Sequence, residues 1–482
     1  MTTPTPAYGK HLDNRAPALD RVLGFLAVCG ALPLSACVAP HEMPFSDTHS
    51  VAKAAPVAFE SARGPVSAQK SSQIIEKLEI ESGDNEILQK HLAVEQALNR
   101  DSPLVLGNKL TLLQDGPATY QAMFAAIRAA KDHINLETYI FEDGEIGTEF
   151  ADLLLAKQAT GVQVNMIYAS VGCLNIPREF FDRLRDRGIR VVEFNPINPV
   201  NVHKKKWLLN NRDHRKLLVV DGRTAFLGGI NISESYSTGS ASKSVKRTGQ
   251  APQAGWRDTQ LQIEGPVVAE LQKDFMDTWA RQKGPAFPER NYFPRLANRG
   301  DEIVRAIASE ADAQASPIYL TLLSAIDHAE RFVHLTNAYF APDPKLVKAL
   351  TGAARRGVDV ELILPGKTDS WLVYQAGHSH YDELLRAGVR IYERRNAVLH
   401  AKTASIDGVW ATVGSTNLDW RSYLHNDELN AVVLGLGFSR QMEAMFAKDR
   451  AASTPIEAAK WQRRSPLQHV QEWLARRFEY WL

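Results

Sequence analysis

The feature that most constrains this chain is an internal repeat, in which short segments of the first half recur in the second half. Residues 137–143 (ETYIFED) match residues 337–343 (NAYFAPD), and residues 188–191 (GIRV) match residues 388–391 (GVRI), each 200 positions later. In both copies a helical pattern, a glycine and a β-branched run follow one another, as expected of strands covered by helices. The sequence therefore predicts two similar α/β halves.

The strongest match within the repeat is a histidine, a lysine and an aspartate with the spacing HxKxxxxD. It occurs at His214, Lys216 and Asp221, and again 186 positions later at His400, Lys402 and Asp407. A short element ending in asparagine follows each motif, and an acidic residue follows that element. These residues are Asn231 and Asp258 in the first copy, and Ser415, Asn417 and Glu428 in the second.

The spacing predicts a site for a phosphodiester. Residues two positions apart on a strand share a face, so each motif presents an imidazole and an ammonium group together. Two such faces around one volume would neutralise a phosphodiester with both lysines. One histidine would attack phosphorus and the other would protonate the leaving alcohol. Further hydrogen bonds to the phosphate are expected from Asn231, Ser415 and Asn417.

The acidic residues are predicted to have two different roles. Asp221 and Asp407 complete the two catalytic motifs but have the opposite strand parity from the histidines, which indicates structural acids at strand ends. Asp258 and Glu428 are better placed to hold the imidazoles in one tautomer. The motifs lack a ligand pattern for zinc or calcium, and the lysines already supply positive charge. We therefore expect neither a metal nor a cofactor.

The doubled HxKxxxxD motif, with its asparagine elements, resembles the HKD signature of the phospholipase D superfamily from about residue 104 to 465. The resemblance implies two α/β/α sandwich halves with mixed central sheets, related by a pseudo-twofold axis and sharing one active site. A monomer would then suffice for the chemistry. By the same resemblance His214 is the nucleophile that forms a phosphohistidine, and His400 is the acid/base.

Several segments resemble bacterial cardiolipin synthases of the phospholipase D type, namely residues 137–141, 213–216, 255–258, 337–340 and 414–422. This resemblance implies transfer of a phosphatidyl group to the glycerol hydroxyl of phosphatidylglycerol, with phosphatidylglycerol or phosphatidylethanolamine as donor. Two alternatives stay open: hydrolysis of phospholipids to phosphatidic acid, and a nucleic-acid phosphodiesterase. A net charge of +1 argues against binding to nucleic acid.

A basic segment precedes the first motif. Between His203 and Lys216 there are six lysines and arginines against the single acid Asp213, with Trp207 among them. This segment is either a solvated loop or a contact with anionic lipid head groups at the mouth of the site, and we favour the contact.

The N-terminus is predicted to address the chain to a membrane. Residues 22–36 form a short apolar run after basic residues, which is typical of a signal peptide. The run ends in Leu34-Ser-Ala-Cys37, which resembles a bacterial lipobox and implies acylation of Cys37. The expected product is a membrane-attached lipoprotein facing the periplasm, with inner or outer membrane left open.

The expected organisation is a signal peptide (1–36), a flexible tether (37–72), a helical lead-in (73–103) broken near Gly83, a first half (104–288) and a second half with a C-terminal helix (289–482). The aromatic and basic residues of 469–482 predict a helix that either lies on a membrane or packs on its own domain. Cys173, the one thiol expected after cleavage and acylation, is predicted to be buried.

Overall fold

The computed structural model describes residues 56–83, 86–197, 211–240, 255–311, 313 and 316–482. All of them belong to one compact unit, which spans Pro44–Leu482. Among these residues no helix combines the length and the apolar composition needed to cross a bilayer.

The first half is built on a mixed sheet with the strand order β6-β5-β4-β8-β9-β10-β3. Strands β4, β5 and β6 are parallel, and the remaining neighbours are antiparallel. The strands are β3 (Leu104–Gln114), β4 (His133–Thr138), β5 (Gln163–Ala169), β6 (Arg190–Phe194), β8 (Leu217–Val220), β9 (Thr224–Gly228) and β10 (Thr259–Glu264). The helices are α4 (Asp115–Ala129), α5 (Glu145–Ala159), α6 (Arg178–Asp186) and α7 (Val268–Arg281).

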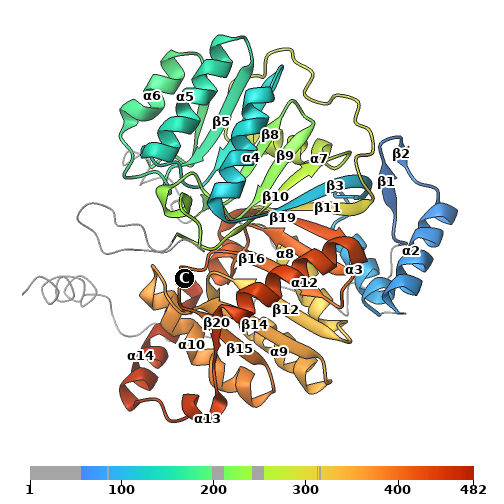
Figure 1. Cartoon of the computed structure of the whole chain (residues 1–482), viewed down its shortest axis with the longest axis vertical. Coiled ribbons are helices and arrows are strands. Elements are labelled where there is room, and N and C mark those ends of the chain that lie inside the picture. Colours follow the sequence, from blue (N-terminus) through green and yellow to red (C-terminus); the bar gives the residue numbers. More distant parts are fainter. Residues whose placement is uncertain (1–55, 84–85, 198–210, 241–254, 312, 314–315) are drawn as a thin grey trace, which may run out of the picture. The chain divides into compact units, whose positions relative to one another are not determined.

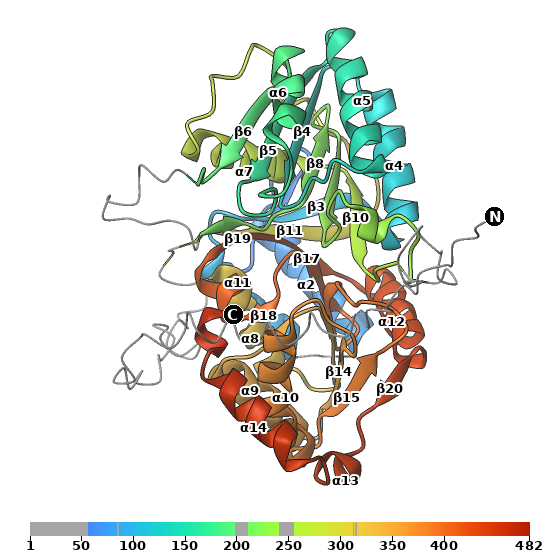
Figure 2. The ribbon, with the colours of Figure 1, turned by 90° about the vertical axis from the view of Figure 1, so that its left-hand side faces the viewer.

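The second half repeats this arrangement with the order β15-β14-β12-β16-β17-β19-β11 and the same strand directions. Its strands are β11 (Glu302–Ser309), β12 (Phe332–Asn337), β14 (Asp359–Pro365), β15 (Arg390–Arg394), β16 (Lys402–Ile406), β17 (Trp410–Gly414) and β19 (Asn426–Leu434). Its helices are α8 (Pro317–Asp327), α9 (Pro344–Arg355), α10 (Trp371–Arg386), α11 (Trp420–Leu424), α12 (Leu436–Ala451), α13 (Ala458–Trp461) and α14 (Pro466–Arg476). The prediction of two similar α/β halves with mixed sheets is confirmed (Figures 1 and 2).

The two sheets are joined edge to edge, because β3 pairs with β11 in antiparallel sense. Alternate residues of β8 point to opposite faces of the sheet and so belong to two hydrophobic cores. Leu217 and Val219 pack in a core shared by both halves. Leu218 and Val220 pack in a core of the first half alone. Helix α7 contributes to the shared core together with α12, whereas α4, α5 and α6 pack on the opposite face. The two halves therefore share one continuous sheet and one hydrophobic core.

The lead-in differs from the prediction at its start. The predicted tether is wrong for residues 56–72, because they contain β1 (Phe59–Ser61), β2 (Gly64–Pro65) and the beginning of α2 (Ala68–Ser82). Strand β1 pairs with β3, and Phe59 is buried, so this segment extends the sheet. Helix α2 ends where the sequence places a break, with Gly83 in a left-handed conformation at φ 86°.

A buried ion pair ties the lead-in to the second half. Glu95 lies on α3 (Leu92–Leu98), and one of its oxygens is 3.1 Å from Nη1 of Arg305 on β11. Its other oxygen accepts a hydrogen bond from Nε1 of Trp410 at 3.0 Å. Burial alone would raise the pKa of Glu95, but the charge of Arg305 and a hydrogen bond with His91 hold that pKa below its usual value. Glu95 is therefore ionised, with Arg305 as its buried counter-charge.

We expect Glu95→Ala to lower the free energy of unfolding by about 3–5 kcal/mol, because it leaves the Arg305 guanidinium buried without its counter-charge. Urea denaturation followed by circular dichroism measures this change. The matched control is Glu81→Ala, which breaks an exposed pair with Lys77 and should change the free energy by less than about 1 kcal/mol. Equal effects of the two substitutions would contradict the assignment.

Candidate active site

The two motif histidines lie where the halves meet, each anchored to the other half by its backbone. His214 follows β7 (Arg212–Asp213), which pairs with β19, and its N–H donates to the carbonyl of Asp427 at 2.9 Å. His400 lies two residues before β16, and its N–H donates to the carbonyl of Arg257 at 2.7 Å. The expected placement of both histidines inside regular strands is thus wrong, although each lies beside one.

Each imidazole is held by an acid from the opposite half. Nδ1 of His214 lies 3.0 Å from both carboxylate oxygens of Glu428, and Nδ1 of His400 lies 2.7 Å from Oδ2 of Asp258. The sequence predicts both acids as orienting groups but not this crossed pairing. A hydrogen bond from Nδ1–H to the carboxylate leaves Nε2 as the free nitrogen of each ring. One chain thus supplies two oriented bases.

Both histidines open into a pocket of about 400 Å³. Its walls come from both halves and from the C-terminus: Tyr139, Ile140, Arg212, His214, Asn231, Trp256, Tyr339, Asp369, Ser370, Val373, His400, Asn417, Asp419, Arg421, Asn426, Trp481 and Leu482.

The motif lysines are buried beside the histidines. Nζ of Lys216 donates to the carbonyl of His214 at 2.6 Å, and Nζ of Lys402 donates to the carbonyl of His400. Burial lowers the pKa of Lys216 to about 7 and that of Lys402 to about 8. The negative charge of a phosphodiester in the adjoining pocket would raise both pKa values again.

Both catalytic imidazoles are uncharged at neutral pH, because their pKa values are lowered. Burial and the charge of Lys216 lower the pKa of His214 well below its usual value, and burial and Lys402 lower that of His400 to about 4. Burial also raises the pKa of Glu428 to about 7, although the charge of Lys216 and the hydroxyl of Ser415 oppose this shift. A neutral imidazole with a free Nε2 is the form required of a nucleophile.

The three predicted phosphate contacts divide into two groups. Asn231 and Asn417 line the pocket, and Oδ1 of Asn417 is buried without a hydrogen-bond partner. Ser415 is fully buried and donates its hydroxyl to Oε2 of Glu428. It therefore fixes the carboxylate that orients His214, and its predicted contact with phosphate is wrong.

The motif aspartates lie at strand ends, away from the histidines. Asp221 accepts hydrogen bonds from the N–H groups of residues 131–133, and Asp407 accepts from those of residues 330–332. Both have left-handed backbones, with φ of 53° and 54°, and a glycine follows each in the hairpin turn. They tie down the loops before β4 and β12, in agreement with the predicted structural role.

Several residues of the site were missed from the sequence. The ring of Tyr139 lies 5.0 Å from that of His214, and the ring of Tyr339 lies 6.0 Å from that of His400, both edge-on. The repeat could have predicted this pair of tyrosines, because they occupy matching positions 200 residues apart in the two halves. Tyr236, whose hydroxyl is 3.0 Å from Nδ1 of His400, has no counterpart in the repeat and gave no signal.

The predicted basic surface near the site is only partly tested. Residues 203–207 lie outside the described residues, as does Cys37. Arg215 is fully buried and bonds to the carbonyl of Ser309 at 2.9 Å, so it does not face lipid. Arg212 lines the pocket. Cys173 is buried as predicted, and burial raises its thiol pKa to about 12.

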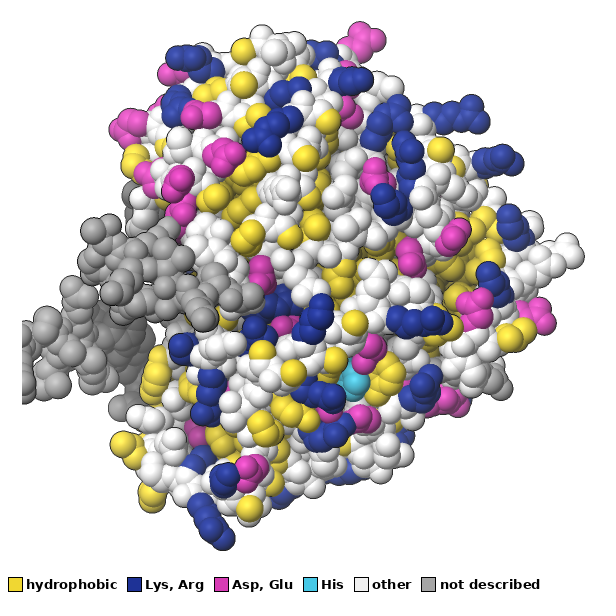
Figure 3. Space-filling model, viewed as in Figure 1, with side chains coloured by type: hydrophobic (Ala, Val, Ile, Leu, Met, Phe, Trp, Pro, Cys, Tyr) yellow, Lys and Arg dark blue, Asp and Glu magenta, His cyan; other side chains and the backbone are white. Residues whose placement is uncertain are grey.

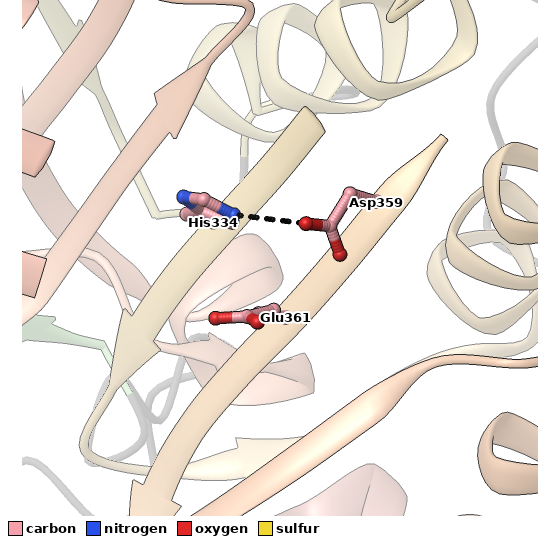
Figure 4. Close-up of side chains that lie close together, drawn as sticks. All are labelled: His334, Asp359 and Glu361. Atoms are coloured by element: carbon pink, nitrogen blue, oxygen red, sulfur yellow. Dashed lines mark ion pairs between the residues drawn. The ribbon is translucent and has the colours of Figure 1, made fainter. Parts of the chain in front are cut away.

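A second cluster of possible metal ligands lies away from the pocket. Figure 4 shows His334 on β12 beside Asp359 and Glu361 on β14. Glu361 is paired with Arg450 at 3.0 Å and with Arg390 at 2.7 Å, so its charge is already balanced. We interpret this cluster as an ion-pair network that joins neighbouring strands.

Comparison with known proteins identifies the class of this site. The profile of the family described as "Cardiolipin synthase, PLD-like domain" matches residues 123–241 and 322–450, one segment in each half. The chain therefore belongs to the cardiolipin synthase family of phospholipase D-like phosphatidyltransferases.

Individual cardiolipin synthases are similar to this chain over most of its length. The chain is 30% identical to the cardiolipin synthase of Alkalihalophilus pseudofirmus over 92% of its own length and 85% of the relative's. It is 36% identical to cardiolipin synthase A of Pseudomonas syringae over 72% of its length and 69% of the relative's. The crystal structure of phosphatidylserine synthase from Haemophilus influenzae shares the fold, with a TM-score of 0.57 and 14% identity over 81% of this chain and 97% of that one.

We expect an alkaline limb in the pH profile of kcat/KM. Both buried lysines are charged below their pKa values of about 7 and about 8, so the free enzyme loses positive charge as the pH rises through this window. Initial rates with phosphatidylglycerol in mixed micelles from pH 6 to 10 measure the profile. In Lys402→Arg the group at residue 402 stays charged, and the limb should become shallower. A flat profile to pH 9.5 in the parent enzyme would contradict the argument.

Proposed function

We propose that the chain transfers a phosphatidyl group from a donor phospholipid to the glycerol hydroxyl of phosphatidylglycerol and so forms cardiolipin. The observation that carries the proposal is the crossed site, in which two histidine–acid pairs open into one pocket and a buried lysine lies beside each histidine. Membership of the cardiolipin synthase family supports this choice of reaction. Because one chain completes both pairs, a monomer suffices.

The proposed reaction has two displacements at phosphorus. In the first, Nε2 of His214 bonds to phosphorus, the bond to the head-group alcohol breaks, and the alcohol leaves with a proton from His400. The arriving phosphodiester raises the pKa of His400 and so allows it to carry that proton. In the second, His400 takes the proton of the acceptor hydroxyl, whose oxygen bonds to phosphorus while the bond to Nε2 breaks.

Transfer to a lipid acceptor, rather than to water, requires a place for a second phosphate. Arg212 and Arg421 line the pocket from opposite halves. Arg212 donates to the hydroxyl of Tyr139 at 3.3 Å, and its Nε is buried without a hydrogen-bond partner among the described residues. Burial and the nearby charge of Arg212 lower the pKa of Arg421. We propose that this cationic pair holds the phosphate of the acceptor.

We further propose that acylated Cys37 anchors the protein to a membrane with the catalytic unit in the periplasm. This proposal is supported by the lipobox-like sequence alone. Its direct test is mass spectrometry of the N-terminal peptide of the protein purified from membranes, in which a diacylated Cys37 is expected and an unmodified cysteine would contradict it.

The reaction is tested by incubating the protein with phosphatidylglycerol vesicles, with and without phosphatidylethanolamine, and reading the lipid products by mass spectrometry. We expect cardiolipin, and no product from His214→Ala or His400→Ala. The head group released, glycerol or ethanolamine, identifies the donor. Phosphatidic acid as the sole product would make the protein a phospholipase D, and the absence of lipid turnover would favour a nucleic-acid phosphodiesterase.

The acceptor subsite is tested with Arg212→Gln. We expect the ratio of cardiolipin to phosphatidic acid to fall by about ten-fold, since one charged hydrogen-bonding group is lost from the acceptor but not from water. The rate of head-group release from the donor should change much less. Arg187→Gln, which alters an exposed arginine on the first half, is the matched control. An unchanged product ratio in Arg212→Gln would reject the subsite.

A further inference from the structure

We infer that the C-terminal helix α14 (Pro466–Arg476) and the turn after it form a docking surface for an anionic lipid bilayer, next to the mouth of the active-site pocket. This inference rests on the proposed function, because it names the surface from which the site would take its lipids. It concerns a part of the chain separate from the predicted acyl anchor.

The helix is attached to the protein by its polar face. Glu472 of α14 is buried and pairs with Arg464 at 2.8 Å, and Arg464 also pairs with Asp382 of α10 at 2.7 Å. One turn beyond α14, Glu479 pairs with Nε2 of His380 on α10 at 3.1 Å. Among apolar residues of α14, Ala475 alone is buried. These ion pairs fix which side of α14 faces the protein.

The opposite face of α14 is apolar and exposed. Leu467, Val470, Leu474 and Phe478 follow helical spacing along one side, and their exposed fractions are 66%, 52%, 48% and 52%. Trp473 is 56% exposed beside them. A helix of a globular protein normally has the reverse orientation, with its apolar stripe buried. An apolar stripe turned outward marks an interaction surface.

Charge complementarity indicates that the partner is anionic. The exposed charged side chains from residue 457 onward are Lys460, Arg463, Arg476 and Arg477, against the single acid Glu457. The guanidinium of Arg477 lies 4.9 Å from the ring of Trp473. Exposed apolar and aromatic side chains flanked by basic ones are the composition of helices that lie in the head-group region of a bilayer.

The surface is continuous with the pocket. After α14 the chain turns so that Trp481 and Leu482 line the pocket, and Arg421 holds both of their carbonyl groups, its Nη2 donating to Trp481 and its backbone N–H to Leu482, each at 3.0 Å. Trp371, at the start of α10 beside the pocket residue Ser370, is 54% exposed. Hydrophobic and basic side chains gather along the edge where Figure 1 places α14, as Figure 3 shows. A bilayer on this surface would present lipid head groups to the pocket.

The experiment compares two triple variants of residues 38–482, a chain that contains the whole compact unit but neither the predicted signal peptide nor Cys37. The first is Leu467→Ser/Leu474→Ser/Phe478→Ser on the docking surface. The second is Ile80→Ser/Leu174→Ser/Phe293→Ser, which removes side chains with 76%, 60% and 53% exposure elsewhere. Binding is measured by co-sedimentation with vesicles of equal parts phosphatidylglycerol and phosphatidylcholine, and thermal unfolding verifies folding.

We expect the first variant to bind vesicles about ten-fold more weakly than the second. Its turnover of vesicle lipids should fall in parallel, while its turnover of monomeric short-chain phosphatidylglycerol should match that of the second variant. Equal binding by the two variants would overturn the inference. So would a change in oligomeric state in the first variant alone, since that result would assign the surface to a second copy of the chain.

The assay separates this inference from the proposed function. If the parent chain fails to turn over short-chain phosphatidylglycerol, the proposed reaction is wrong, whereas the sedimentation result still decides whether α14 binds lipid. A single variant, Trp473→Ser, repeats the binding measurement with minimal change to the fold, and it should also weaken binding relative to the second triple variant.

Discussion

The crossed contact between each catalytic histidine and an acid of the opposite half is the interaction on which the rest of the structure depends. It requires Glu428 on β19 to lie against His214, and Asp258 beside β10 to lie against His400. The edge-to-edge pairing of β3 with β11 and the core shared by α7 and α12 provide that alignment. Neither half alone contains a complete histidine–acid pair, so the site is complete only where the two halves meet.

Burial sets the pKa values of the catalytic groups and so their reactivity. The lysines and histidines of both motifs are buried together, and their pKa values fall because the charged forms lose solvation and repel one another. An incoming phosphodiester is the group that relieves this repulsion. Binding energy for phosphate and reactivity at phosphorus thus have one physical origin, the burial of positively charged groups close to one another.

Most of the fold and most of the site could be predicted from the sequence. The reason is that each motif occurs in both halves, so that one copy supports the interpretation of the other. The paired motifs, both orienting acids and the two-half architecture could all be read from matching segments. Both motif histidines lie just outside the strands predicted to hold them, and the other predictions that failed concern single side chains or short segments without a counterpart. Ser415 bonds to Glu428 instead of facing the pocket, Arg215 is buried instead of facing lipid, and residues 56–72 extend the sheet instead of forming a tether.

By itself the sequence determined which chemical groups the protein has and that they occur twice, since residue types and spacings are local properties. Only the tertiary structure decided which acid serves which histidine, because that choice depends on strand pairing between residues more than 140 positions apart. It likewise decided that the charged face of α14 turns inward: the pattern of an amphipathic helix defines two faces, and the ion pairs of Arg464 with Asp382 and Glu472 select the one that is buried.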